Sequence, residues 1–324
     1  MDPSFLAMGN DISVKQNTEK QINRLAAQRS LYTRAKTISS LQLLITAVVV
    51  SALAVFAIVV ESNDLLSNHR ALRENIPWIM ATVGVFTALL DLLLLTPIIT
   101  KIKGTAAKTQ ELFDTDVLTM DWNEIAAGVK PDEEDILAWG NRVCKDPDKV
   151  AQLKDWYSTK LDSLTINAAR FVCQRSNLWW DADIRKFYVT VVTCLVTLSI
   201  LLLVSASLWN GLTFRDVFLE IAAPALPLII YAYRQWKENG EAVARLTRLK
   251  ELLNVTWKKY LSENMTDVEC HDASRKLQDQ IFSNREANPL IPDFIYNLRK
   301  SSQHDSMAYS IDDMISEMGN SSAN

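Results

Sequence analysis

The chain alternates between stretches that are nearly free of charge and stretches that are rich in charged residues. No charged residue occurs between Lys36 and Glu61, and none occurs between Lys186 and Arg215. A helix rises about 1.5 Å per residue, so roughly 20 apolar residues cross the hydrocarbon layer of a membrane. The pattern therefore predicts a mostly α-helical integral membrane protein whose crossings form two hairpins. The four expected crossings are residues 39–60, 76–100, 187–209 and 217–233.

Two of these crossings contain an acidic residue. The second is interrupted only by Asp91. In the fourth, the uncharged stretch 221–233 is shorter than the roughly 17 residues that a span needs. Extending this stretch back to Val217 admits Glu220, which lies at the entry end and can reach the interface. We therefore expect a fourth crossing.

The basic residues near the ends of the crossings predict the orientation of the chain. Lys and Arg gather on the cytoplasmic side of membrane helices. The 61–75 loop and the loop after Trp209 contain few of them, so these loops are expected outside. Both termini and segment 101–186 are then cytoplasmic, and the protein is expected in the bacterial inner membrane. The basic residues that favour this orientation are Arg29, Arg34, Lys36, Lys101, Lys103, Lys108, Arg234 and Lys237.

The remaining segments predict cytoplasmic helices, because they carry charge and few turn residues. We expect an N-terminal helix over 1–38, a helical domain over 101–186 and C-terminal helices over 234–300. Residues 301–324, rich in Ser, Asn, Asp and Met, predict a disordered tail.

One cytoplasmic stretch has the spacing of a coiled-coil seam. Its apolar positions step by three and four residues. Such a seam either packs inside the subunit or pairs with the same helix of a neighbouring copy, and the spacing does not distinguish the two. The positions are Leu246, Leu249, Leu253, Thr256 and Tyr260.

Composition and motifs exclude several classes of protein. The net charge of −4 does not indicate the basic surface with which proteins bind duplex nucleic acid. The cysteines, Cys144, Cys173, Cys194 and Cys270, lack metal-ligand spacing, so we expect free thiols and no metal site. No nucleophile elbow, phosphate-binding loop or zinc-protease motif occurs, and no histidine lies in a crossing. We therefore expect a protein that is not an enzyme and needs no cofactor.

Polar residues inside the crossings are candidates for lining a pore. An acid within the bilayer costs about 2.5–3.5 kcal/mol on the insertion scale and usually faces the bundle or a wet cavity. Threonines at helical spacing on one face either bond a neighbouring helix, line a water path or bond their own backbone. One four-helix subunit cannot enclose a wide pore, so conduction would require a homo-oligomer. The candidates are Asp91, Thr190, Thr193 and Thr197.

The segment "QRSNLWWDADIRKFYV" (174–189) places two tryptophans just before the third crossing. Tryptophans favour the headgroup zone of a membrane, so a simple interfacial collar is one interpretation. The other is a binding or gating segment, in which arginines meet phosphates and tryptophan rings stack on bases. A third is that the polar residues pin the helix to another part of the chain, at Asp116 or Asp121. The ligand-binding or gating candidates are Arg170, Gln174, Arg175, Asn177, Trp179, Trp180, Asp181 and Arg185.

Four motifs resemble one bacterial protein family: "LAAQRSLYTRAK" (25–36), "ELFDTDVLTMDWNE" (111–124), "CQRSNLWWDADIRKFY" (173–188) and "KLQDQIFSNREANPLIPDFIYNLRK" (276–300). The chain is similar to the SMODS-associated four-transmembrane pore-forming effectors of anti-phage systems. It departs from their pattern at Ser158, where proline is expected after "DWY".

The resemblance implies a function in abortive infection. In such systems a nucleotidyltransferase makes a cyclic oligonucleotide on infection, and the effector responds by breaching the inner membrane. The resemblance also implies that residues 174–181 join a cytoplasmic sensor to the pore helix. The expected partners are then the lipid bilayer, other copies of the chain and a cyclic oligonucleotide from a cognate nucleotidyltransferase. A non-conducting membrane scaffold that recruits a cytoplasmic partner is the alternative.

Overall fold

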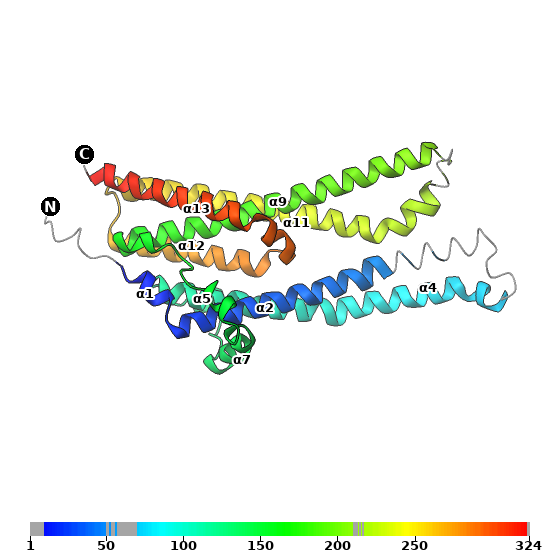
Figure 1. The fold of residues 1–324 in the computed structure, drawn as a ribbon, viewed down its shortest axis with the longest axis horizontal. Helices are drawn as coiled ribbons and strands as arrows, with labels where there is room; N and C mark the ends of the chain where they lie inside the picture. The colour runs from blue at the N-terminus through cyan, green and yellow to red at the C-terminus, as the bar shows by residue number, and fades with distance from the viewer. Residues whose placement is uncertain are drawn as a thin grey trace. The chain divides into compact units, whose positions relative to one another are not determined.

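The described part of the chain is almost entirely helical and contains no β-strand, which confirms the expectation of a mostly α-helical protein. Figure 1 shows the helices of the computed structural model along the chain. The structure describes residues 10–49, 70–209 and 217–322 and the single positions 52, 56, 213 and 215. Parts of the expected first crossing and of both expected outer loops lie outside these residues.

The chain divides into two units, and several helices contribute residues to both. The packed unit comprises Met1–Arg34, Lys101–Lys186 and Glu241–Asn324. The apolar unit comprises Ala35–Thr100 and Phe187–Gly240. The α-helices are α1 (Ile12–Gln16), α2 (Glu19–Leu43), α4 (Arg70–Leu90), α5 (Thr96–Val117), α6 (Glu124–Ala127), α7 (Glu133–Cys144), α8 (Pro147–Ala151), α9 (Ile166–Trp209), α11 (Ala223–Leu261), α12 (Asp267–Ala287) and α13 (Asp293–Ser322). Short π-helical turns η2 (Leu44–Val49), η3 (Asp91–Leu95) and η5 (Val217–Ala222) and a 3₁₀ turn η4 (Thr159–Ser163) complete the elements.

A continuous apolar core holds the packed unit together. Burial of large side chains such as Phe113, Phe171 and Ile281 removes apolar surface from water and supplies the main favourable term in folding. Local signals set the helix ends: the side chain of Thr266 and that of Glu269 form a reciprocal capping box at the start of α12. The core joins α5 and α9 to α11, α12 and α13, which come later in the sequence.

The coiled-coil-like positions of α11 pack inside the subunit. Leu246 and Leu253 are buried, and Leu249 and Tyr260 pack against the same core. The neighbouring Trp257 is also buried and stacks on the Tyr260 ring at a centroid distance of 5.6 Å. The seam is therefore occupied by the chain's own helices.

The expectation of a disordered tail is wrong for residues 301–322. Residues up to Ser322 belong to α13, drawn in red in Figure 1. Ile311 and Met314 enter the core, the Trp257 indole N–H donates to Glu317 at 2.7 Å, and Lys160 pairs with Asp312 at 2.6 Å. Composition predicted disorder because the few apolar residues of this segment find their partners only on other helices.

The apolar unit differs from the packed unit in how many of its large apolar side chains are exposed. Its large apolar side chains are mostly exposed: Phe86 is 66% exposed, Leu92 68% and Leu202 62%. Two helical stretches, Trp78–Val117 and Ile166–Leu202, are long and apolar enough to cross a membrane. They contain most of the expected second and third crossings, and the first and fourth crossings stay predictions.

Replacing Gly140 with alanine should destabilise the packed unit by about 1–3 kcal/mol, the usual cost of overpacking. A Cβ at this position of α7 would lie 3.0 Å from the backbone oxygen of Asn23 and 3.2 Å from the backbone nitrogen of Ala27, both in α2. Backbone atoms cannot rotate away, so the two helices must separate. Hydrogen exchange of α2 and α7 amides measures the effect.

Gly240→Ala in α11 is the matched control, because a Cβ there meets nothing within 4 Å. Removing a glycine from a helix interior should stabilise it by roughly 0.5–1 kcal/mol. Equal effects of the two substitutions would contradict the proposed close contact of α7 with α2.

Candidate functional site

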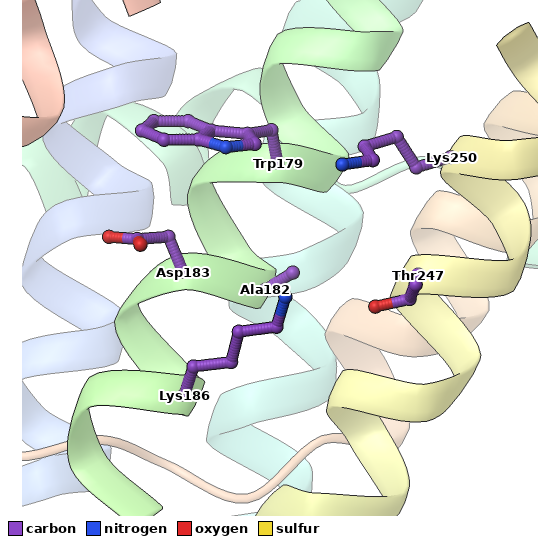
Figure 2. Close-up of a pocket in the computed structure, with 6 residues that line it drawn as sticks. All are labelled: Trp179, Ala182, Asp183, Lys186, Thr247 and Lys250. Carbon is purple, nitrogen blue, oxygen red and sulfur yellow. The ribbon is translucent and has the colours of Figure 1, made fainter. Parts of the chain in front are cut away.

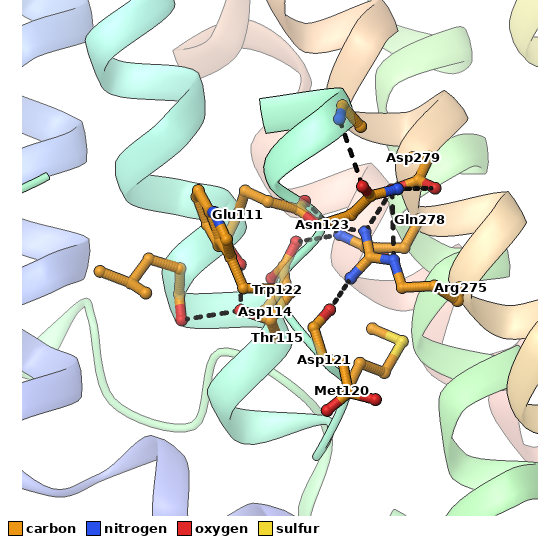
Figure 3. Close-up of polar contacts among 12 residues, drawn as sticks. Glu111, Asp114, Thr115, Met120, Asp121, Trp122, Asn123, Arg275, Gln278 and Asp279 are labelled. Atoms are coloured by element: carbon orange, nitrogen blue, oxygen red, sulfur yellow. Dashed lines mark hydrogen bonds and ion pairs between the residues drawn. The ribbon is translucent and has the colours of Figure 1, made fainter. Parts of the chain in front are cut away.

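A buried cluster of charged and amide side chains joins α5 to α12. Asp114 and Glu111 lie one helical turn apart on α5 and are 0% and 1% exposed. Arg285 pairs with Asp114 at 2.5 Å, and Arg275 pairs with Glu111 at 2.7 Å. Gln278 donates to both carboxylates, at 2.8 Å to Glu111 and 3.1 Å to Asp114. We call these five residues the α5–α12 polar network, and Figure 3 shows most of it.

The electrostatics of this network favour the charged form of Arg285 and the protonated form of Tyr157. Burial disfavours the charged guanidinium of Arg285, but the neighbouring carboxylates of Asp114 and Glu111 outweigh burial, so the pKa of Arg285 is raised. Tyr157 donates its phenolic proton to Asp114 at 2.7 Å. Burial, followed by the Asp114 charge, raises the pKa of Tyr157 well above its usual value. The phenol therefore stays a donor at neutral pH.

Two residues of the predicted binding segment connect α9 to this network. Gln174 is fully buried and donates to the Ser274 carbonyl at 2.8 Å and to Gln278 at 3.2 Å. Asn177 donates to the Tyr157 hydroxyl at 3.0 Å. Both side chains therefore hold α9 against other parts of the packed unit.

The two arginines that precede the tryptophans also bind the chain itself. Arg170 donates to the Leu118 carbonyl at 2.8 Å and to the Thr119 carbonyl, which follow the end of α5. Arg175 donates to Asn254 on α11 at 3.0 Å and to Ser310 on α13. The partners of Arg175 are uncharged, so they do not neutralise its positive charge.

Asp181 and Arg185 form an ion pair on α9, with Arg185 Nε 2.9 Å from an Asp181 oxygen. Arg185 also donates to the Pro289 carbonyl at 3.0 Å, and Asn288 donates to Asp181 at 3.1 Å. The Trp180 carbonyl accepts from Gln303 of α13. These contacts connect α9 to the turn between α12 and α13 and to α13 itself. They agree with the interpretation that polar residues pin the helix, although the partners are not Asp116 or Asp121.

Trp179, another predicted candidate, is partly exposed. It lines a small cleft between α9 and α11, which we call the α9–α11 cleft and which Figure 2 shows. The Lys250 side chain reaches from α11 toward α9, and the Lys186 ammonium lies beside Ala182. Thr247 and Lys250 were not predicted from the sequence, because nothing in the neighbouring residues distinguishes a cleft lysine from any other lysine on a charged helix face. The lining residues are Trp179, Ala182, Asp183, Lys186, Thr247 and Lys250.

The predicted pore-lining residues fall in the apolar unit. Asp91 begins the π-helical turn η3 and accepts hydrogen bonds from Gln42 of α2 and from Thr96 at 3.2 Å. Gln42, which the sequence analysis did not single out, also donates to Thr96 at 3.1 Å. These three residues form a polar cluster within the apolar unit.

The threonine stripe lies on an exposed face of α9. Thr190, Thr193 and Thr197 are exposed in the single chain. The Thr193 hydroxyl donates to the backbone carbonyl of Val189 at 2.8 Å, which leaves it able to accept a further hydrogen bond. The stripe is therefore accessible to water, lipid or another subunit.

Comparison with known proteins decides the family of this chain. The model of the SMODS-associating 4TM effector domain matches residues 10–314. The chain belongs to the SMODS-associating 4TM effector family. This confirms the resemblance drawn from the sequence motifs. A relative from Bacillus cereus (strain VD146), described as a probable CBASS effector molecule, is 24% identical over 298 residues, which are 90% of this chain and 94% of the relative.

The family is one of four-transmembrane proteins by its description, and this chain has two long apolar helical stretches among its described residues. Together these observations indicate a membrane protein. No solved structure matches the chain.

Proposed function

We propose that this chain is the pore-forming effector of a CBASS anti-phage system. A cyclic oligonucleotide from the cognate nucleotidyltransferase binds the packed unit on the cytoplasmic side. The apolar unit then opens a path through the inner membrane, which permeabilises the cell and ends the infection. The effector acts without catalysis and without a cofactor.

The observation that carries this proposal is the contrast within the apolar unit. Its side chains are exposed and apolar, as in Phe86 and Leu92, yet it holds the polar cluster of Asp91, Gln42 and Thr96. An acid within a membrane helix is expensive and usually marks an ion pathway or a buried polar interface. The description of the relative as a CBASS effector supports the same function.

A pore would require several copies of the chain, because one subunit is too small to enclose it. Four helices pack into a bundle whose interior is filled by side chains, so a single subunit does not enclose a wide channel. Several copies that place Asp91 and the threonine stripe of α9 toward a common axis would surround a wet path. The exposure of Thr190, Thr193 and Thr197 in the single chain supports this arrangement.

Continuity of α9 supports ligand gating. Residues 174–186 and the expected crossing 187–209 belong to this one helix. A ligand that moves the first part therefore acts on the second through a rigid element. The ligand shifts the closed–open equilibrium only by as much as it binds the open arrangement more tightly.

A non-conducting membrane scaffold is the alternative function. The exposed Leu252 and Val255 on α11 offer apolar surface to a cytoplasmic partner and favour this reading. A scaffold would not require a polar cluster within its crossings.

Liposomes that contain the purified full-length protein and a trapped dye should leak when a cognate cyclic oligonucleotide is added. The test uses a panel of cyclic di- and trinucleotides, and release at least tenfold above protein-free liposomes is expected for one or more of them. The linear dinucleotides are the control and should cause no release. Folded, oligomeric protein that leaks with no member of the panel would refute the pore.

A further inference from the structure

The charges around the α9–α11 cleft are predominantly positive. Lys186 and Lys250 line it, and Arg175 lies near enough for its charge to act on Lys250. The acidic lining residue, Asp183, is already engaged: Arg299 pairs with it at 3.1 Å and Gln303 donates to it at 3.0 Å. A cleft of this charge attracts an anion.

Lys250 is held in an unfavourable position for a cation. Partial burial, then the positive charges of Arg175 and Lys186, lower the pKa of the Lys250 ammonium, and the Glu251 carboxylate only partly compensates. Within the described part of the chain, no ion pair to Lys250 is formed. A bound anion would relieve this repulsion, because its negative charge would offset the positive charges that act on Lys250.

At the rim of the cleft, the Trp179 ring extends from α9 away from α11, where it can stack on a planar group attached to an anion held between the helices (Figure 2). The Trp179 ring is half-buried, and its indole N–H forms no hydrogen bond among the residues that the structure describes. A tryptophan ring stacks on any nucleobase, and such stacking contributes about 1–3 kcal/mol per base. Thr247 on the opposite wall carries a hydroxyl that can donate to an anionic oxygen.

We propose that the α9–α11 cleft binds a phosphodiester group, whose oxygens contact Lys186 and Lys250 while Trp179 stacks on an attached base. In this nucleotide form the inference rests on the proposed function, and it identifies where the activating ligand is held. The cleft is small, so it holds only part of a larger ligand, such as one phosphodiester. The remainder of the ligand lies outside, where a second copy of the chain could contact it.

The headgroup of a phospholipid offers the same chemistry. Lys186 directly precedes the expected crossing 187–209, so an anionic lipid could reach the cleft from the membrane. A test must therefore separate the two sources of phosphodiester. It uses full-length protein in a maltoside detergent, which contains no phosphate.

The test measures protection of lysines from acetylation in the wild-type protein, read by mass spectrometry of peptides. The probes are the panel of cyclic di- and trinucleotides and, in a second arm, short-chain phosphatidylglycerol. Acetylation of Lys186 and Lys250 should slow at least fivefold with a binding probe. Lys258, an exposed lysine on the same helix as Lys250, should react at an unchanged rate. Protection by the lipid alone would support the site with a lipid headgroup as its source.

A charge reversal gives an independent measurement. Lys250→Glu should weaken binding of the cyclic oligonucleotide at least tenfold by equilibrium dialysis, since it converts an attraction to a repulsion. Lys258→Glu makes the same change in charge outside the cleft and should leave affinity unchanged. Because Lys250 lies partly at the surface, the variant should fold, as circular dichroism and gel filtration would verify.

The possible outcomes distinguish failure of the proposed binding site from failure of the proposed pore. Equal affinity of both variants, or binding of a probe without protection of Lys186 and Lys250, would overturn the cleft as the site while leaving dye release intact. No binding of any nucleotide or lipid probe would overturn it as well. Normal binding and protection without dye release would instead refute the proposed pore and keep the site.

Discussion

Replacing Arg285 with methionine should lower the free energy of unfolding of the packed unit by about 3–5 kcal/mol. Methionine fills similar volume but leaves the Asp114 carboxylate without its ion pair, at 0% exposure. Breaking one partner of a buried pair is costly, because the remaining charge stays in a poorly solvated environment. Hydrogen exchange of α5 and α12 amides in the full-length protein measures the loss. A thermal transition of the packed unit should fall by roughly 10 °C.

Arg248→Met is the matched control, since Arg248 is exposed on α11. Its effect should stay within about 0.5 kcal/mol. Adding Asp114→Asn to Arg285→Met should recover part of the stability, because the double variant buries no uncompensated aspartate. If Arg285→Met and Arg248→Met cost the same, the α5–α12 polar network would not stabilise the fold.

Replacing Asp91 with leucine should abolish ligand-dependent leakage, with a fall of at least tenfold in the rate of dye release. The substitution removes the acceptor shared by Gln42 and Thr96 and makes the proposed path apolar. Membrane insertion should not suffer, because an acid within a crossing costs about 2.5–3.5 kcal/mol that leucine avoids. Chemical cross-linking in detergent should show that the oligomer still assembles.

Two further variants sharpen this test. Thr193→Leu should reduce leakage if the threonine stripe faces the path. Thr82→Leu makes the same change at an exposed threonine of α4 outside the stripe and should have little effect. A non-conducting scaffold should tolerate all three substitutions equally. Leakage that survives Asp91→Leu would therefore exclude a conducting role for this acid.

The membrane-type regions could be predicted from the sequence because they depend on local composition. Long runs without charge, such as the one between Lys186 and Arg215, indicate a crossing whatever lies elsewhere in the chain. The position of Asp91 inside such a run is equally local. The family could also be recognised from short motifs, since each motif consists of consecutive residues and requires no knowledge of tertiary contacts.

The sequence did not predict which side chains contact one another. Helical spacing shows that Glu111 and Asp114 share a face of α5, but not that Arg275 and Arg285 of α12 cover that face. The same holds for Arg175, whose chemistry suits a phosphate as well as it suits its actual partners, Asn254 and Ser310. Periodicity defines a face, and only packing selects what meets it.

The sequence by itself determined the helical class, the order of apolar and charged segments and the family. The tertiary structure decided that the residues after 300 form a packed helix, that the α11 seam lies inside the subunit and that Trp179 borders a cleft with Lys250. The physical reason is the range of the interactions. Apolar length and helix propensity act over a few turns, whereas each of these contacts joins residues that only the folded core brings together.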